Sequence, residues 1–114
     1  MSPKYERLQN EIIGTTKLYQ QVMGLGHIAI NHIFDTRELS ESVAECSPLW
    51  EYQTADIKWY LKGHEDMDVV NVAVHELSHV LLAPIQEHVP KKYEKISEWV
   101  TESLAKAIIN AKEW

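Results

Sequence analysis

The chain has 114 residues, of which 45% are hydrophobic and 25% charged, and its formal net charge at pH 7 is −6. This length predicts one domain that spans residues 1–114 and buries a core without cross-links. The acidic balance argues against nucleic acid as a partner, because phosphate binding needs a basic face. Cys46 is the only cysteine, so an internal disulfide is excluded. A packing role is the better expectation for this thiol than a nucleophilic one.

The first third of the chain predicts a helix followed by a strand. The helix is expected from Pro3 to Met23, with Ser2 as its N-cap and glycines beyond its end. Its predicted apolar stripe consists of Leu8, Ile12, Leu18 and Val22. Residues 27–35, HIAINHIFD, alternate and are rich in isoleucine, which predicts a strand. His27 and His32 fit no shared ligand spacing and are expected to be strand-face side chains.

The middle of the chain predicts a loop and then one or two strands. Residues 35–49 are rich in Asp, Glu and Ser and contain Pro48. A loop is therefore expected there, with a brief strand at VAEC as the alternative. Residues 49–61 alternate between polar and apolar side chains, which predicts a half-buried strand. Tyr52, Thr54, Asp56 and Lys58 are predicted on one side of this strand, and Gln53, Ala55, Ile57 and Trp59 on the other.

Two helices are predicted in the last half of the chain. The first is expected from Asp66 to about Glu87, with Asp66 or Asp68 as its N-cap. Pro84 is expected to end this helix near Leu82 or to bend it there. The second helix is expected from Lys91 to Lys112. Its predicted apolar face consists of Ile96, Val100, Leu104, Ala107, Ile108 and Ala111. This order of elements predicts the α+β class: an N-terminal helix, a small β-sheet and two further helices.

The stretch VVNVAVHELSHVLLAP places two histidines and a glutamate inside an otherwise apolar helix. His75 and His79 are four residues apart, so they lie about 40° apart on one helical face and can reach one ion. Zinc accepts neutral imidazole nitrogens and takes four ligands. Glu76 lies about 60° from His79, so it borders the metal without needing to bind it. The motif therefore predicts a zinc site in which Glu76 is the catalytic acid–base residue.

The last helix offers carboxylates for a third metal ligand. Glu94, Glu98 and Glu102 follow one another at intervals of four residues. Like charges at this spacing repel one another unless positive charge lies beside them. Either nearby lysines or a metal ion can supply this positive charge. Glu98 is the predicted third ligand, with Glu102 and Glu94 as the alternatives and His88 as a rival. If Glu98 binds the metal, Glu102 is placed one turn on to hold a ligand histidine.

With these residues, the chain resembles zincin-type metallopeptidases of the gluzincin branch, which pair H-E-x-x-H on one helix with a glutamate on the next. The interval from His79 to Glu98 is similar to that of thermolysin-like enzymes, although Glu102 stands where those enzymes carry aspartate. The stretches VNVAVHELSHVLLAPIQE and SEWVTESLAKAII also resemble small phage and prophage proteins described as metallopeptidases. The likeness covers about residues 55–110. It implies a minimal zincin-like domain with Zn²⁺ on His75, His79 and Glu98, and Glu76 as the catalytic residue.

The expected function is thus a zinc-dependent peptidase that cleaves peptide bonds of a peptide or protein substrate through a metal-activated water, with Glu76 as general base. In zincins a strand beside the active-site helix offers its edge to the substrate. Residues 52–60 are the expected strand, and His64 or Tyr93 are candidate oxyanion stabilisers.

The alternative is a non-enzymatic phage or regulatory module that binds another protein and carries a structural or vestigial zinc site. A protease acting on DNA-bound proteins is disfavoured by the acidic charge. Because the N-terminal MSPKYERLQNEI is charged and no apolar run is long enough to span a bilayer, no membrane partner is expected. The expected location is the cytoplasm, which is the host cytoplasm for a phage-encoded protein.

Overall fold

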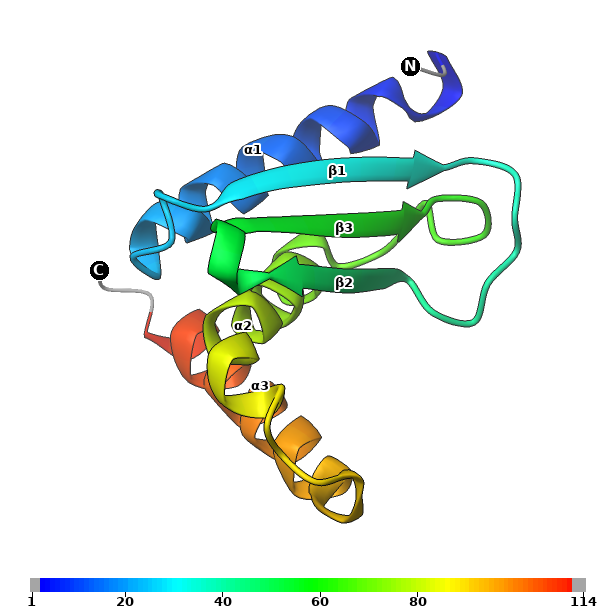
Figure 1. Ribbon diagram of the computed structural model, residues 1–114. Coiled ribbons are helices and arrows are strands. Elements are labelled where there is room, and N and C mark those ends of the chain that lie inside the picture. Colours follow the sequence, from blue (N-terminus) through cyan, green and yellow to red (C-terminus); the bar gives the residue numbers. More distant parts are fainter. Residues whose placement is uncertain (1–2, 112–114) are drawn as a thin grey trace.

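The computed structural model describes residues 3–111 and confirms the α+β class. A three-stranded sheet has helices packed on one of its faces (Figure 1). The elements in chain order are α1 (Glu6–Val22), β1 (Ala29–Asp35), β2 (Ala44–Leu49), β3 (Thr54–Tyr60), α2 (Val69–Gln86) and α3 (Glu94–Asn110). Short 3-10 helices precede α1, β3 and α3 at Pro3–Tyr5, Trp50–Tyr52 and Lys91–Tyr93. No helix of the described residues is long and apolar enough to cross a membrane.

The sheet has the strand order β1-β3-β2, so β3 is its central strand. β1 pairs with β3 in parallel and β2 pairs with it antiparallel. The predicted alternation of β3 is confirmed, because Ala55, Ile57 and Trp59 are buried against the helices while Asp56 is exposed on the other face. A sheet covered on one face only is expected to alternate in this way.

β2 was expected as a loop with at most a brief strand, and the loop prediction is wrong for residues 44–49. The strand tolerates Pro48 because it lies at the edge of the sheet, where a missing N–H need not break the ladder. Tyr60 N donates to the Val43 carbonyl at 2.9 Å, in the register that continues as Ala44↔Trp59. Hydrogen-bonded and non-hydrogen-bonded residue pairs alternate along an antiparallel ladder. Because Val43 belongs to a bonded pair, Ala44, Cys46 and Pro48 do not bond to β3, and their backbone groups point to the free edge of the sheet.

Two apolar clusters hold the helices on the sheet. One lies under the first half of α1 and the start of α2, around Trp59 and Ile12. The other lies under the middle of α2 and includes Leu77 and, from α3, Ala105. α2 contributes to both clusters, which explains why its sequence is apolar around most of its circumference. It is therefore the helix about which the other elements are arranged.

Three details of the helices differ from expectation. Leu18 of the predicted α1 stripe is 50% exposed, because α1 turns Gln9, Thr16 and Tyr19 inward beside Ile12. α2 does not end near Leu82 but continues through Pro84 to Gln86. The proline ring is exposed, and its missing N–H removes only the bond to the Val80 carbonyl. The expected Ser2 cap and the Lys112 end of the last helix lie outside the described residues.

The face that α3 turns inward also differs from expectation. Ile96 is 61% exposed and Val100 39%, whereas Thr101 and Ala105 are buried against α2. Small side chains at this contact let the two helix axes approach closely. The larger apolar residues in the first half of α3 are consequently left at the surface.

Asp68 is the N-cap of α2, and its side chain accepts a hydrogen bond from the Asn71 backbone N–H at 3.2 Å. We expect Asp68→Ala to lower the free energy of unfolding by about 1 kcal/mol, because that N–H loses its partner. Asp66→Ala is the matched control, since Asp66 lies outside the helix and should change stability by less than half as much. Urea denaturation followed by circular dichroism measures both, and equal losses would show that the cap is not specific to Asp68.

Candidate metal centre and active-site cleft

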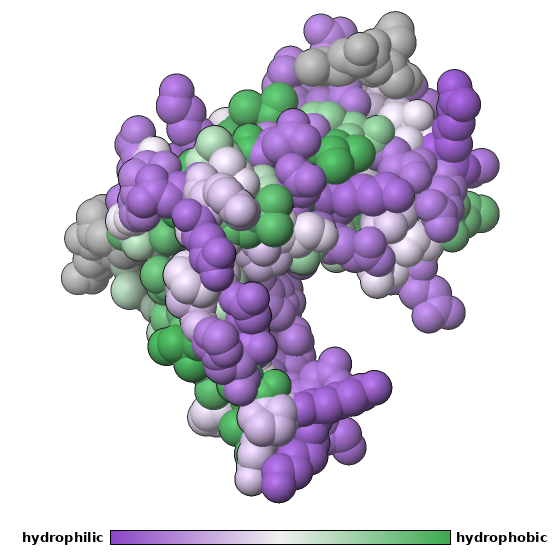
Figure 2. All heavy atoms as spheres, in the orientation of Figure 1, coloured by the Kyte–Doolittle hydropathy of each residue, from purple (hydrophilic) through white to green (hydrophobic). Residues whose placement is uncertain are grey.

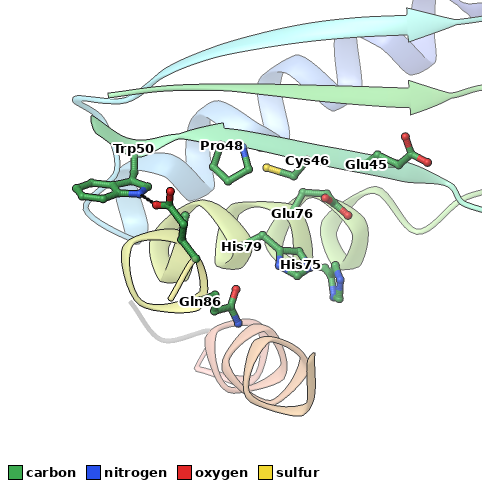
Figure 3. Close-up of a pocket in the computed structure, with 11 residues that line it drawn as sticks. Glu45, Cys46, Pro48, Trp50, His75, Glu76, His79 and Gln86 are labelled. Carbon is green, nitrogen blue, oxygen red and sulfur yellow. Dashed lines mark hydrogen bonds between the residues drawn. The ribbon is translucent and has the colours of Figure 1, made fainter. Parts of the chain in front are cut away.

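His75 and His79 project from the same face of α2, as their spacing predicts. Their ring centroids lie 4.9 Å apart with the rings nearly perpendicular, at 78°. Both side chains are partly buried, with 29% and 27% of their surface exposed. In Figure 3 they point away from β2 and towards the helix that packs below α2. The two imidazoles therefore open onto α3.

Glu98 of α3 meets both histidines with one oxygen. Its Oε1 lies 3.2 Å from Nε2 of His75 and 3.7 Å from Nε2 of His79. The three ligand atoms all lie within 4.8 Å of one another. Ligands bound at 2.0–2.1 Å to a tetrahedral zinc are separated by about 3.3 Å, so the two distances to Glu98 Oε1 are close to those of a metal site. The sequence prediction that these three side chains come together agrees with this arrangement.

Hydrogen bonds across the helix contact set the position of Glu98. Gln86, in the last turn of α2, donates from Nε2 to the Ser97 carbonyl at 3.1 Å and to Thr101 Oγ1 at 2.8 Å. Thr101 is fully buried and donates in turn to the Ser97 carbonyl at 3.2 Å. These bonds fix the rotation of α3 against α2 at the residue next to Glu98. The position of the α3 backbone therefore directs the Glu98 side chain towards the two histidines.

The alternative ligands do not join the cluster. Among residues 3–111, the only group of three or more His, Cys, Asp or Glu side chains with converging ligand atoms is His75, His79 and Glu98. Burial and the charge of His79 lower the pKa of His75, while the charges of Glu98 and Glu102 raise it by smaller amounts. The pKa of His75 is lowered overall, which favours the neutral imidazole that a metal requires. His88 lines a different groove, and neither Glu94 nor Glu102 adds a ligand atom to the cluster.

Glu76 lies on the opposite side of α2 from Glu98 and faces the sheet. It is only 6% exposed and lines the cleft between β2 and α2. Burial raises its pKa to about 7, with smaller contributions from Glu98 and Glu45. Ionising a buried carboxylate is costly, and groups with a pKa shifted by burial are concentrated at functional sites.

A cleft of about 600 Å³ lies between β2 and α2 and contains the motif residues (Figure 3). Its walls are Ala44, Glu45, Cys46, Pro48, Trp50, His75, Glu76, His79, Ala83, Gln86 and Glu87. The expectation that residues 52–60 supply a free strand edge is wrong, because β3 is paired on both sides. The strand beside the cleft is β2, whose unpaired N–H groups at Ala44 and Cys46 belong to its free edge.

One end of the cleft is closed by a contact that the sequence did not predict. The Trp50 indole N–H donates to Glu87 at the end of α2, which ties the strand to the helix. Trp50, Pro48 and Ala83 make this end apolar. Neither β2 nor Trp50 carries a motif, and the only signal for them is the alternation of small apolar residues at 44, 46 and 48.

The two expected oxyanion stabilisers lie elsewhere. His64 contacts the Ser40 carbonyl through Nε2 at 2.7 Å in the loops beyond the sheet. Tyr93 lines the groove at the other side of the α2–α3 contact. Neither side chain lines the cleft, so neither is in position for the expected role.

Comparisons with known proteins add no family to this description. No family model, curated protein or solved structure matched the chain. The zincin likeness therefore stays a prediction from the residues quoted above, and a function has to be argued from the geometry of the site.

Cys46 faces the cleft beside Glu76, and its environment makes it a poor nucleophile. Burial raises the pKa of the thiol to about 12, with smaller contributions from the charges of Glu76 and Asp56. At pH 8 we expect iodoacetamide to alkylate the folded protein at least about 100-fold more slowly than the urea-unfolded chain, because the thiolate is the reactive form. Mass spectrometry of quenched samples gives both rates. Comparable rates would mean that the thiol is accessible and ionised in the folded state.

Proposed function

We propose that this chain is a zinc-dependent peptidase in which His75, His79 and Glu98 hold the metal and Glu76 is the general base. The proposal rests on the convergence of three side chains from two helices: Nε2 of His75 and Nε2 of His79 both lie near Oε1 of Glu98. Two imidazoles and a carboxylate form a donor set that zinc accepts, and their separations suit its bond lengths.

The number of ligands supports a catalytic site over a structural one. Among the residues from 3 to 111, no fourth His, Cys, Asp or Glu side chain joins the three. Structural zinc is held by four protein ligands, whereas catalytic zinc uses three and reserves a position for water or substrate. The site also borders an open cleft, which a purely structural ion does not need.

Zinc bound here would lower the pKa of a coordinated water towards 7 and polarise the carbonyl of the scissile bond. Glu76 follows His75 directly and reaches the cleft from the side of β2. Its carboxylate would take the proton from the attacking water and pass it to the leaving amine. The burial of Glu76 limits the access of bulk water to the transferred proton. Glu98 places negative charge beside the two histidines, away from Glu76.

The free edge of β2 supports a peptide as the substrate class. An extended peptide added to this edge would bond to the N–H groups of Ala44 and Cys46 and to the neighbouring carbonyls. These backbone groups lie along the same cleft as Glu76 and the two histidines. Pro48 offers no N–H, so the added strand would end near the apolar wall formed with Trp50.

The metal site predicts a defined pattern of zinc loss. We expect purified protein loaded with zinc to carry one ion per chain by inductively coupled plasma mass spectrometry. His79→Ala and Glu98→Gln should lose most of it, because two ligands bind zinc far less tightly than three. Glu94→Gln is the matched control one turn earlier on α3 and should keep its zinc. Full zinc occupancy in Glu98→Gln would contradict the assignment of the third ligand.

The role of Glu76 predicts a loss of cleavage without a loss of metal. Glu76→Gln should keep its zinc and cleave fluorescein-labelled casein at least about 100-fold more slowly than the parent, because the amide cannot accept the proton. Glu87→Gln makes the same chemical change at the end of the same cleft and should stay within a few-fold of the parent. If Glu76→Gln cleaves as fast as the parent, or the zinc-loaded parent cleaves neither casein nor a panel of unstructured peptides, the proposed function is wrong.

A further inference from the structure

The cleft between β2 and α2 continues past the first residue of the strand. A second hollow of about 330 Å³ shares Ala44, His75 and Glu76 with the cleft and extends to Ser42. An extended peptide at the free edge of β2 would therefore run along both hollows. Glu45 lies between Ala44 and Cys46, the two residues whose backbone groups point to that edge. It is thus near the middle of the path that the peptide would take.

Glu45 carries its charge on the outer face of the sheet. Side chains alternate along a strand, so Ala44 and Cys46 face α2 whereas Glu45 is exposed on the other side. Figure 3 shows its carboxylate pointing away from α2. Tyr60 of β3 donates a hydrogen bond from its hydroxyl to Oε2 of Glu45 at 3.0 Å, which holds the carboxylate beside the strand. Hydrophilic side chains cover most of this face of the sheet (Figure 2).

The charge of Glu45 is not neutralised by a neighbouring cation. Lys58 lies opposite Glu45 on β3, but its Nζ lies 3.8 Å from Oδ2 of Asp35 on β1 and 5.0 Å from the centre of the Tyr60 ring. None of the ion pairs within residues 3–111 includes Glu45. Its carboxylate is therefore available to a charge that arrives at the edge of the sheet.

The lining of the two hollows has one sign of charge. Its ionised side chains are carboxylates, and no lysine or arginine of the described residues borders either hollow. Two of these carboxylates have other roles, because Glu76 is the proposed general base and Glu87 accepts a hydrogen bond from Trp50. The proposed zinc ion would add positive charge only on the helix side of β2. Glu45 is thus the acidic side chain that a bound peptide would meet on the outer face.

A strand added to β2 would place one of its side chains directly opposite Glu45. The peptide residues that pair with Ala44 and Cys46 turn their side chains towards α2, so the residue between them turns its side chain to the outer face. This alternation is the same for both directions of the added strand. Side chains opposed across an antiparallel pair have Cβ atoms about 4.5–5.5 Å apart, and opposite charges in such positions attract.

We propose that Glu45 selects a lysine or arginine at the substrate residue that pairs with it across the edge of β2. This inference rests on the proposed peptidase function, because it needs a peptide bound along the cleft. A basic side chain at that residue is attracted by the carboxylate, and an acidic one is repelled. Because the pair forms in the bound substrate as well as in the transition state, it lowers KM and leaves kcat unchanged.

The test uses internally quenched peptides of neutral sequence and the full zinc-loaded chain. A single lysine, glutamine or glutamate is moved through successive positions on both sides of the cleaved bond. At one position the lysine peptide should exceed the glutamate peptide in kcat/KM by about fivefold, with glutamine between them, because exposed cross-strand charge pairs are weak. The difference should lie in KM and should shrink as salt rises.

Substitutions of Glu45 assign the preference to its charge. Glu45→Gln should give the lysine and glutamate peptides equal KM values at that position, and Glu45→Lys should favour the glutamate peptide. Glu51→Gln is the matched control and should keep the preference of the parent, since Glu51 is exposed and lines neither hollow. Unchanged zinc content and thermal unfolding would show that each variant is folded.

A binding measurement separates the role of Glu45 from the peptidase function. Fluorescence anisotropy of the same peptides with Glu76→Gln, which should bind without cleaving, should show the same ratio in Kd. Cleavage without a charge preference at any position, or a preference that survives Glu45→Gln, would overturn the role of Glu45 and leave the peptidase proposal standing. A binding preference that Glu45→Gln removes, without cleavage of any peptide by the parent, would uphold Glu45 and contradict the peptidase. Neither binding nor cleavage would overturn both.

Discussion

The contact between α2 and α3 is the constraint on which the candidate site depends. Two of the three candidate ligands come with the motif on α2, but the third reaches them only if α3 lies at the right distance and rotation. Small residues at the contact set the distance, and the bonds from Gln86 to Ser97 and Thr101 set the rotation. A helix turned by one residue would direct Glu98 about 100° away from the histidines. The fold thus uses a polar contact between helices to place a carboxylate.

The same contact separates two surfaces with different chemistry. On one side of α3 Glu98 faces the two histidines, which also line the cleft along β2. On the other side Ile96 and Val100 border an apolar groove between the two helices. Both sides therefore depend on the position of one helix.

The sequence was most informative where periodicity and spacing act locally. The helical spacing of His75 and His79, the alternation of β3 and the positions of the helices follow from such local rules, and the described residues agree with them. Glu98 was singled out among the three glutamates by its interval from His79, which resembles that of thermolysin-like enzymes, and not because its position in space was calculable. The rotation of α3 was predicted wrongly, because hydrophobicity alone favours burying Ile96 and Val100 over Ser97 and Thr101. β2 was missed because Pro48 and its polar neighbours indicate a loop, and its position at the edge is a property of the whole sheet.

The most direct measurement of the metal centre is an anomalous difference map, collected at the zinc edge from crystals of the zinc-loaded protein. One peak should lie 2.0–2.1 Å from Nε2 of His75, Nε2 of His79 and a carboxylate oxygen of Glu98, the bond lengths of zinc to imidazole and carboxylate. Glu76 should stand beside the ion without binding it. A peak elsewhere, no peak despite full zinc loading, or an ion enclosed by four protein side chains would contradict a catalytic zinc at this position.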